Sequence, residues 1–121
     1  MRFDGFRREG RIQEQQAVTR ELDVRRRDLE QQASVDVRGA LLDLAAAREA
    51  VGASRDRLRF AEQEVSQAAE RFRAGVAGNA DVVNAAFTLN AARSQYVDVL
   101  TSLQMARVSL ARSEGAVTQL R

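Results

Sequence analysis

The feature that most constrains this chain is a heptad repeat that occurs twice, once on each side of a short glycine-containing break. In each half a large residue recurs at every seventh position, and a small residue follows three positions later. Alternating large and small residues at this spacing are typical of two helices packed along a seam. The large seam residues are Val37, Leu44, Val51, Leu58, Val65 and Phe72 before the break, and Val82, Leu89, Tyr96, Leu103 and Leu110 after it.

The small residues set the register of the predicted seam. If the chain folds back at the break, each large residue lies level with a small one, so that Val51 meets Ala106 and Phe72 meets Ala85. A slip of one residue would leave voids, and each void the size of a methyl group costs about 1 kcal/mol. The small residues are Ala40, Ala47, Ser54, Ala61 and Ala68, then Ala85, Ala92, Val99, Ala106 and Ser113.

Composition favours long helices on both sides of the break. Proline is absent, and Ala, Arg, Gln, Glu and Leu dominate, all of them good helix formers. We therefore predict an all-α fold: a long antiparallel helical hairpin or coiled coil with unequal arms, forming a single domain over residues 1–121. The first helix is expected over about 7–74 with Asp4 as its N-cap, and the second over about 79–114, where Gly115 ends it.

The break at residues 75–79 carries the residue types that reverse a helical chain. Gly75 suits the left-handed position just after a helix, and Val76 suits the apolar position that follows it in a Schellman motif. Gly78 or Asn79 then caps the second helix, with a carboxylate, Asp81, in the first turn. Such a protruding tip is a compact surface suited to docking a partner.

The first predicted helix is longer than the second by some 30 residues. This extra length carries an apolar stripe that has no partner in the second helix, and an isolated helix of this size is marginal in water. We expect another protomer or further parts of a larger protein to cover it. The stripe consists of Ile12, Val18, Leu22 and Leu29.

The residue types argue against an enzyme. Without His and Cys, the chain lacks the usual zinc ligands, an imidazole base and any thiolate, and no glycine-rich phosphate-binding motif occurs. We expect no catalytic residues, no cofactor and no metal site. The run Arg25-Arg26-Arg27 has no interleaved aromatic residues and has acidic neighbours, so nucleic-acid binding is the weakest hypothesis.

No apolar stretch approaches about 20 residues, and the N-terminus lacks the apolar region of a signal peptide. The chain as given is expected to be soluble. Any export signal is expected to lie outside it.

Residues 71–85, RFRAGVAGNADVVNA, resemble the hairpin tip of TolC-like outer-membrane efflux proteins, in which a glycine is followed six residues later by Asp-Val. Residues 3–8, FDGFRR, resemble the segment where such a chain leaves its β-barrel and enters the long helix. The spacing of Leu89, Ala92, Tyr96, Ala106, Leu110 and Gly115 is similar to that of the returning helix. The resemblance covers nearly the whole chain.

The resemblance implies an exit duct for tripartite efflux or type I secretion. Such ducts are homotrimers with a β-barrel in the outer membrane and a helical barrel that meets a periplasmic adaptor protein and an inner-membrane pump. This chain is similar to the second structural repeat only, so we expect the periplasmic coiled-coil portion of a Gram-negative outer-membrane protein. It would be a fragment of a larger protein or a relative reduced to its coiled coil.

The resemblance also implies roles for individual residues. Carried over by position, the tip docks adaptor hairpins, and Asp81 with Asn84 lines the periplasmic aperture. The alternative hypothesis, from the heptads alone, is a cytosolic coiled-coil scaffold that dimerises through the stripe from Ile12 to Leu29. The residues expected at the docking tip are Gly75, Val76, Ala77, Gly78 and Asn79.

Overall fold

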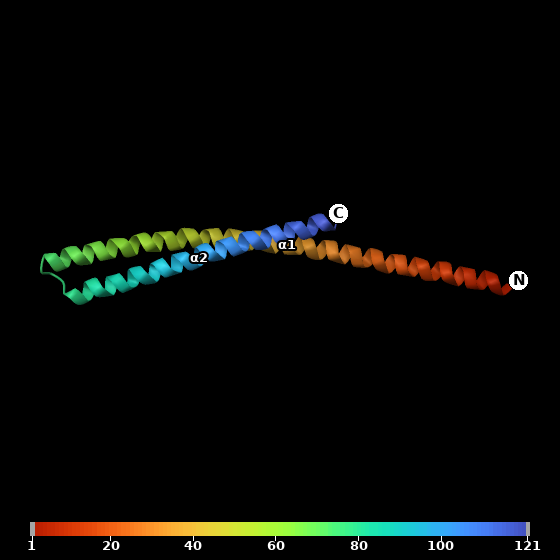
Figure 1. Cartoon of the computed structure of the whole chain (residues 1–121), viewed down its shortest axis with the longest axis horizontal. Coiled ribbons are helices and arrows are strands. Elements are labelled where there is room, and N and C mark those ends of the chain that lie inside the picture. Colours follow the sequence, from red (N-terminus) through yellow and green to blue (C-terminus); the bar gives the residue numbers. More distant parts are fainter. Residues whose placement is uncertain (1, 121) are drawn as a thin grey trace.

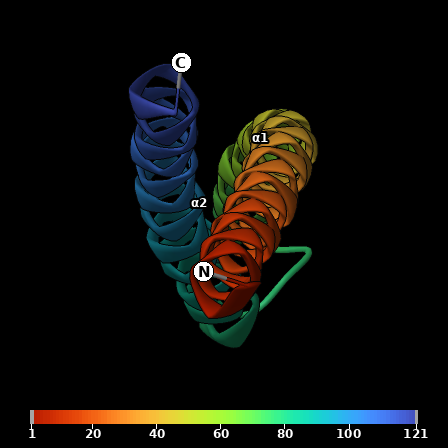
Figure 2. The same cartoon turned by 90° about the vertical axis from the view of Figure 1, so that its right-hand side faces the viewer.

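The computed structural model describes residues 2–120, with side chains from Gly5 onward, and consists of two helices. Helix α1 spans Arg2–Arg73 and helix α2 spans Asn79–Gln119. They lie side by side in antiparallel orientation and cross at a shallow angle (Figures 1 and 2). The predicted all-α hairpin with unequal arms and a turn near residues 75–79 is therefore confirmed.

The seam between α1 and α2 forms a thin core built mainly from small side chains. Ala92 is the most buried residue of the core, at 1% exposure, and Ala61 follows at 3%. Leu44, Val51 and Leu103 form a buried cluster. The predicted partner of Val51, Ala106, is among the partly buried residues that pack against this cluster. These residues are Ala47, Tyr96, Val99, Ala106 and Leu110.

Apolar burial, rather than charge pairing, holds the two helices together. Burying a Val or Leu side chain stabilises a fold by about 1.5–3 kcal/mol. By contrast, the ion pairs among the described residues are exposed and lie within α1, at i,i+3 or i,i+4 spacing. Such pairs contribute only about 0.3–0.5 kcal/mol each to a helix.

The N-terminal part of α1 extends alone beyond the end of α2 (Figure 1). Every described side chain from Gly5 to Gln32 is exposed, and Ala33 is the first buried residue among those that the structure describes. The four residues of the predicted stripe, Ile12, Val18, Leu22 and Leu29, are all exposed. This segment of residues 5–32 is called the arm below.

Both helices differ in length from the sequence prediction. Helix α1 begins at Arg2, so Asp4 lies inside its first turn and not at the N-cap. The start is earlier because only Gly5 among these first residues disfavours helix. Helix α2 continues through Gly115 to Gln119, so the prediction that Gly115 ends it is wrong.

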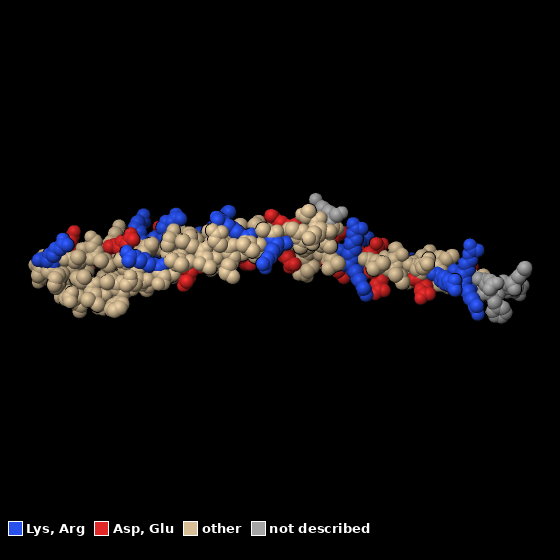
Figure 3. Space-filling view, in the orientation of Figure 1, with Lys and Arg blue, Asp and Glu red and all other residues tan. Residues whose placement is uncertain are grey.

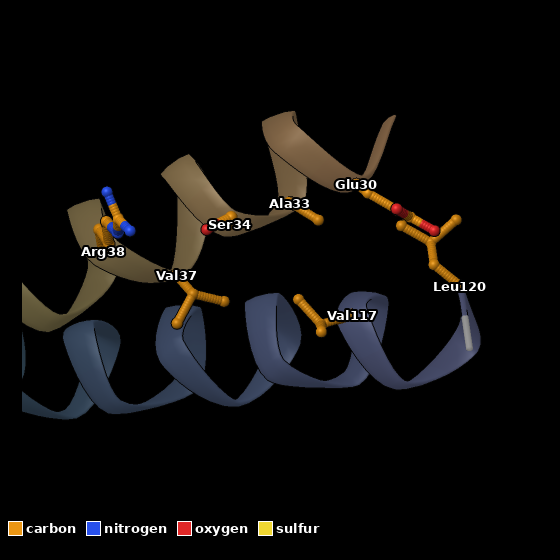
Figure 4. Close-up of a pocket in the computed structure, with 7 residues that line it drawn as sticks. All are labelled: Glu30, Ala33, Ser34, Val37, Arg38, Val117 and Leu120. Carbon is orange, nitrogen blue, oxygen red and sulfur yellow. The ribbon is translucent and has the colours of Figure 1, made fainter. Parts of the chain in front are cut away.

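Packing explains why the second helix passes through its glycine. Beyond Gly115, the half-buried Val117 lines a groove together with Val37 of α1. The two valine side chains point toward one another in Figure 4, where Leu120 lies near Glu30 at the end of the same groove. A glycine inside a helix costs only about 1 kcal/mol, and burial of the next apolar turn compensates for it.

Candidate functional site at the hairpin tip

The turn between the helices is a Schellman motif centred on Gly75. The N–H of Val76 donates to the carbonyl of Arg71 at 3.0 Å, and the N–H of Gly75 donates to the carbonyl of Phe72 at 3.0 Å. These two bonds satisfy carbonyl groups that the end of α1 would otherwise leave unpaired. Gly75 has φ of 74°, in the left-handed region that favours glycine, so it occupies the position that the sequence predicted.

Helix α2 begins without a side-chain cap. Its N-cap residue, Gly78, has extended backbone angles, φ −82° and ψ 166°, and has no side chain that could bond to the first amide groups. Asp81 lies in the first turn, and its N–H donates to the carbonyl of Gly78 at 3.2 Å. The carboxylate in this turn complements the positive end of the helix dipole.

The tip exposes an uncharged, partly apolar surface. No charged residue occurs between Ala74 and Ala80, and Val76 is 78% exposed. Ala77 is half-buried, and Asn79 is exposed. Figure 3 shows a broad uncharged surface along α2 next to the turn, in tan at the lower left. The turn therefore presents an exposed valine within an uncharged segment.

The two predicted aperture residues lie together on the first turns of α2. Asp81 and Asn84 are both exposed, and their spacing of three residues places them on the same side of the helix. They therefore present one carboxylate and one carboxamide per chain to the surroundings. The neighbouring Val82 and Ala85 are half-buried toward the seam.

The predicted seam residues lie along the contact between the helices, with one difference at the tip. Leu44, Val51 and Leu103 are buried, whereas Phe72 is 48% exposed. Phe72, which lies next to the turn, is the most exposed of the predicted seam residues. The remaining members are half-buried: Val37, Leu58, Val65, Val82, Leu89, Tyr96 and Leu110.

Sequence reasoning missed a second set of apolar side chains near the tip. Val83 and Phe87 are exposed on the outer side of α2, and Phe87 is 68% exposed. The available signal was a second series of uncharged residues on the same helix, out of phase with the seam. This second series is a weaker signal than the seam series, in which large residues recur at every seventh position.

Two of the three arginines in the run Arg25-Arg26-Arg27 pair with glutamates of the same helix. Arg25 bonds to Glu21 at 2.8 Å, and Arg26 bonds to Glu30 at 3.3 Å. These pairs reduce the positive charge available for a phosphate backbone.

Among the described side chains, no group of three carboxylates is placed to hold a metal ion.

Comparison with known proteins identifies the family. The family model described as "Outer membrane efflux protein" matches residues 3–116, most of the chain. The chain belongs to the outer membrane efflux protein family. Searches of curated proteins and of solved structures found no match.

Membership of the outer membrane efflux protein family gives the chain its broad role and confirms the resemblance seen in the sequence. It makes the chain a component of an outer-membrane efflux channel, and the family comprises transport channels and not enzymes. Family members are located at the outer membrane and in the periplasm. No helix within residues 2–120 combines the length and apolar character needed to cross a bilayer.

Proposed function

We propose that the chain forms the periplasmic coiled-coil portion of an efflux duct, and that its tip docks a periplasmic adaptor protein. The observation that carries the proposal is the tip itself: an uncharged turn, fixed by two backbone hydrogen bonds, that exposes Val76 at the end of a long two-helix rod. Outer membrane efflux proteins act with adaptor proteins and form trimers, and this family property supports the proposal.

The rod and the tip have different tasks in this proposal. The seam keeps both helices in a fixed register, so that the turn is held at a defined distance from the rest of the duct. The residues proposed to contact the adaptor are Gly75, Val76, Ala77, Gly78 and Asn79. Asp81 and Asn84 are proposed to face the duct at its periplasmic aperture, where a carboxylate favours cations over anions.

The docking claim is tested with the variant Val76→Asp. Because Val76 is 78% exposed, this substitution leaves the seam intact and places a charge in the proposed interface. Binding of the isolated helical hairpin of the cognate adaptor to the full chain is measured by titration calorimetry. We expect affinity to fall about tenfold or more, as expected when an interface buries an unpaired charge.

The matched control is Met105→Asp, which also adds a carboxylate at an exposed apolar position but lies far from the turn. It is expected to bind the adaptor hairpin as the unmodified chain does. Equal binding by the unmodified chain and Val76→Asp would refute docking at the tip.

A further inference from the structure

The hairpin has two broad faces, one on each side of the seam. The hydrogen bond from Arg57 to Gln95 joins two residues that each directly precede a large seam residue, Leu58 and Tyr96. Positions just before the large seam residues therefore lie on the same face in both helices. Positions four residues after the large seam residues flank the seam on its other side, and so they share the opposite face.

The face away from Arg57 is rich in arginine, and we call it the arginine face. It comprises the positions one and four residues after the large seam residues, and it carries seven arginines but only two carboxylates, Glu62 and Glu114. All nine charged residues are exposed. The arginines are Arg38, Arg48, Arg55, Arg59, Arg73, Arg93 and Arg107.

The face that bears Arg57 has the opposite balance, and we call it the acidic face. It holds five carboxylates and three arginines, and both Asp81 and Asn84 belong to it. The proposed function turns these two residues toward the duct, so the arginine face points outward, to the surroundings of the duct. This step rests on the proposed function. The carboxylates are Asp36, Asp43, Glu64, Asp81 and Asp98.

Most of the arginine face has no counter-charge within the chain. Arg48, Arg55 and Arg107 flank seam residues of one buried cluster, so they gather in the same part of the rod. Arg55 and Arg59 are four residues apart, a spacing at which like charges destabilise a helix. Five arginines have no carboxylate three or four residues away and form no ion pair with a described side chain: Arg38, Arg48, Arg55, Arg93 and Arg107.

The chemistry of the arginine face indicates a ligand that carries several carboxylates. A guanidinium group matches a carboxylate through two parallel hydrogen bonds. Arg48 and Arg55 are two helical turns apart, about 10 Å at 1.5 Å per residue, so an extended polymer can contact them in succession. No aromatic residue occurs on the arginine face, which therefore lacks the stacking surfaces that bind single-stranded nucleic acid.

We propose that the arginine face binds peptidoglycan through the free carboxylates of its peptide stems. The family is located at the outer membrane and in the periplasm, where this polymer is the extended carboxylate-bearing ligand. Each exposed contact between a guanidinium and a carboxylate is weak, but several contacts along one rod act together. Binding on the outward face would hold the duct in the cell wall without blocking the aperture.

The first test measures co-sedimentation of the full chain with purified, insoluble peptidoglycan at low salt. We expect the unmodified chain to bind, and binding to weaken as salt screens the charges. A triple variant that loses three cations of the arginine face is expected to bind about tenfold more weakly. Its substitutions are Arg48→Gln, Arg55→Gln and Arg107→Gln.

The matched control removes the three arginines of the acidic face, with the substitutions Arg57→Gln, Arg71→Gln and Arg112→Gln. It lowers the net charge of the chain by the same amount and is expected to bind peptidoglycan as the unmodified chain does. Circular dichroism checks that both triple variants keep their helix content. Equal weakening by both would assign binding to net charge and overturn the proposal, and so would an unmodified chain that does not bind.

A second test changes the ligand. Peptidoglycan whose carboxylates have been converted to amides is expected to lose most of its binding, and unchanged binding overturns the proposal. Vesicles that contain phosphatidylglycerol test phosphate as the ligand. If the chain binds these vesicles through the arginine face but does not bind peptidoglycan, the proposal is wrong. Val76→Asp is expected to bind peptidoglycan normally, so a failure of adaptor docking is read separately.

Discussion

The guanidinium of Arg57 in α1 donates a hydrogen bond of 2.6 Å to the side-chain carbonyl of Gln95 in α2, 38 residues along the chain. Both side chains line a groove beside the seam together with Ser54 and Val99. The bond therefore joins the two helices at one fixed register, next to the buried contacts that provide most of the stability.

The first prediction concerns the strength of this hydrogen bond. Because both side chains are exposed, Gln95→Ala is expected to lower the free energy of unfolding by only about 0.5–1 kcal/mol. Urea denaturation measures the change, and a double-mutant cycle with Arg57→Ala isolates the pair. A coupling energy near zero would show that the bond does not persist in solution.

The second prediction concerns the left-handed residue of the turn. Gly75→Ala places a Cβ at φ of 74°, and we expect it to lower the free energy of unfolding by about 1–2 kcal/mol. Thermal or urea denaturation followed by circular dichroism reports the loss. The control is Gly78→Ala at φ −82°, which involves no left-handed strain and is expected to cost only about 0.5 kcal/mol, because an N-cap prefers glycine to alanine. Equal destabilisation by both variants would argue against backbone strain as the cause.

The third prediction concerns a glycine in the interior of α1. A Cβ added at Gly52 meets no heavy atom within 4 Å, and the residue is exposed. Gly52→Ala should therefore raise the free energy of unfolding by about 0.8–1 kcal/mol through helix propensity alone. The midpoint of urea denaturation should increase. A decrease would mean that the glycine accommodates a bend or a contact that the added methyl group disturbs.

The fourth prediction concerns a polar atom in the seam. Ser54 is 4% exposed, and its Oγ has no hydrogen-bond partner among the described protein atoms. An unsatisfied buried hydroxyl costs about 1–3 kcal/mol, so Ser54→Ala should stabilise the hairpin by about 1 kcal/mol. Ser66→Ala is the control, since Ser66 is exposed and reports helix propensity alone. The idea fails if the two substitutions have the same effect on unfolding.

The fifth prediction concerns the arm. Its described side chains are all exposed, and an unpaired helix of this length is marginal in water. Backbone amides of the arm should therefore exchange hydrogen for deuterium much faster than those of Leu44 or Val51 in the seam. Exchange followed by mass spectrometry at low protein concentration measures the difference. Equal protection in the arm and the seam would show that something covers the arm.

The sequence alone determined the hairpin and its turn. The heptads of large and small residues require two helices in contact, and the glycines of the break mark where the chain reverses. The position of Gly75 was predictable because many helices end with a residue in the left-handed conformation, and glycine adopts this conformation without strain. Family membership was predictable because the residues that carry the resemblance are spread over nearly the whole chain, with residues 71–85 around this turn.

The tertiary structure decided the features that depend on contacts between helices. Helix α2 continues through Gly115 because Val117 lies beside Val37 of α1 in one groove. The helix propensities of the residues around Gly115 cannot predict a contact with another helix. Phe72 fits the heptad but lies half-exposed next to the turn. Periodicity shows which residues share a face. Which faces are covered depends on where the second helix lies, and packing in three dimensions decides that.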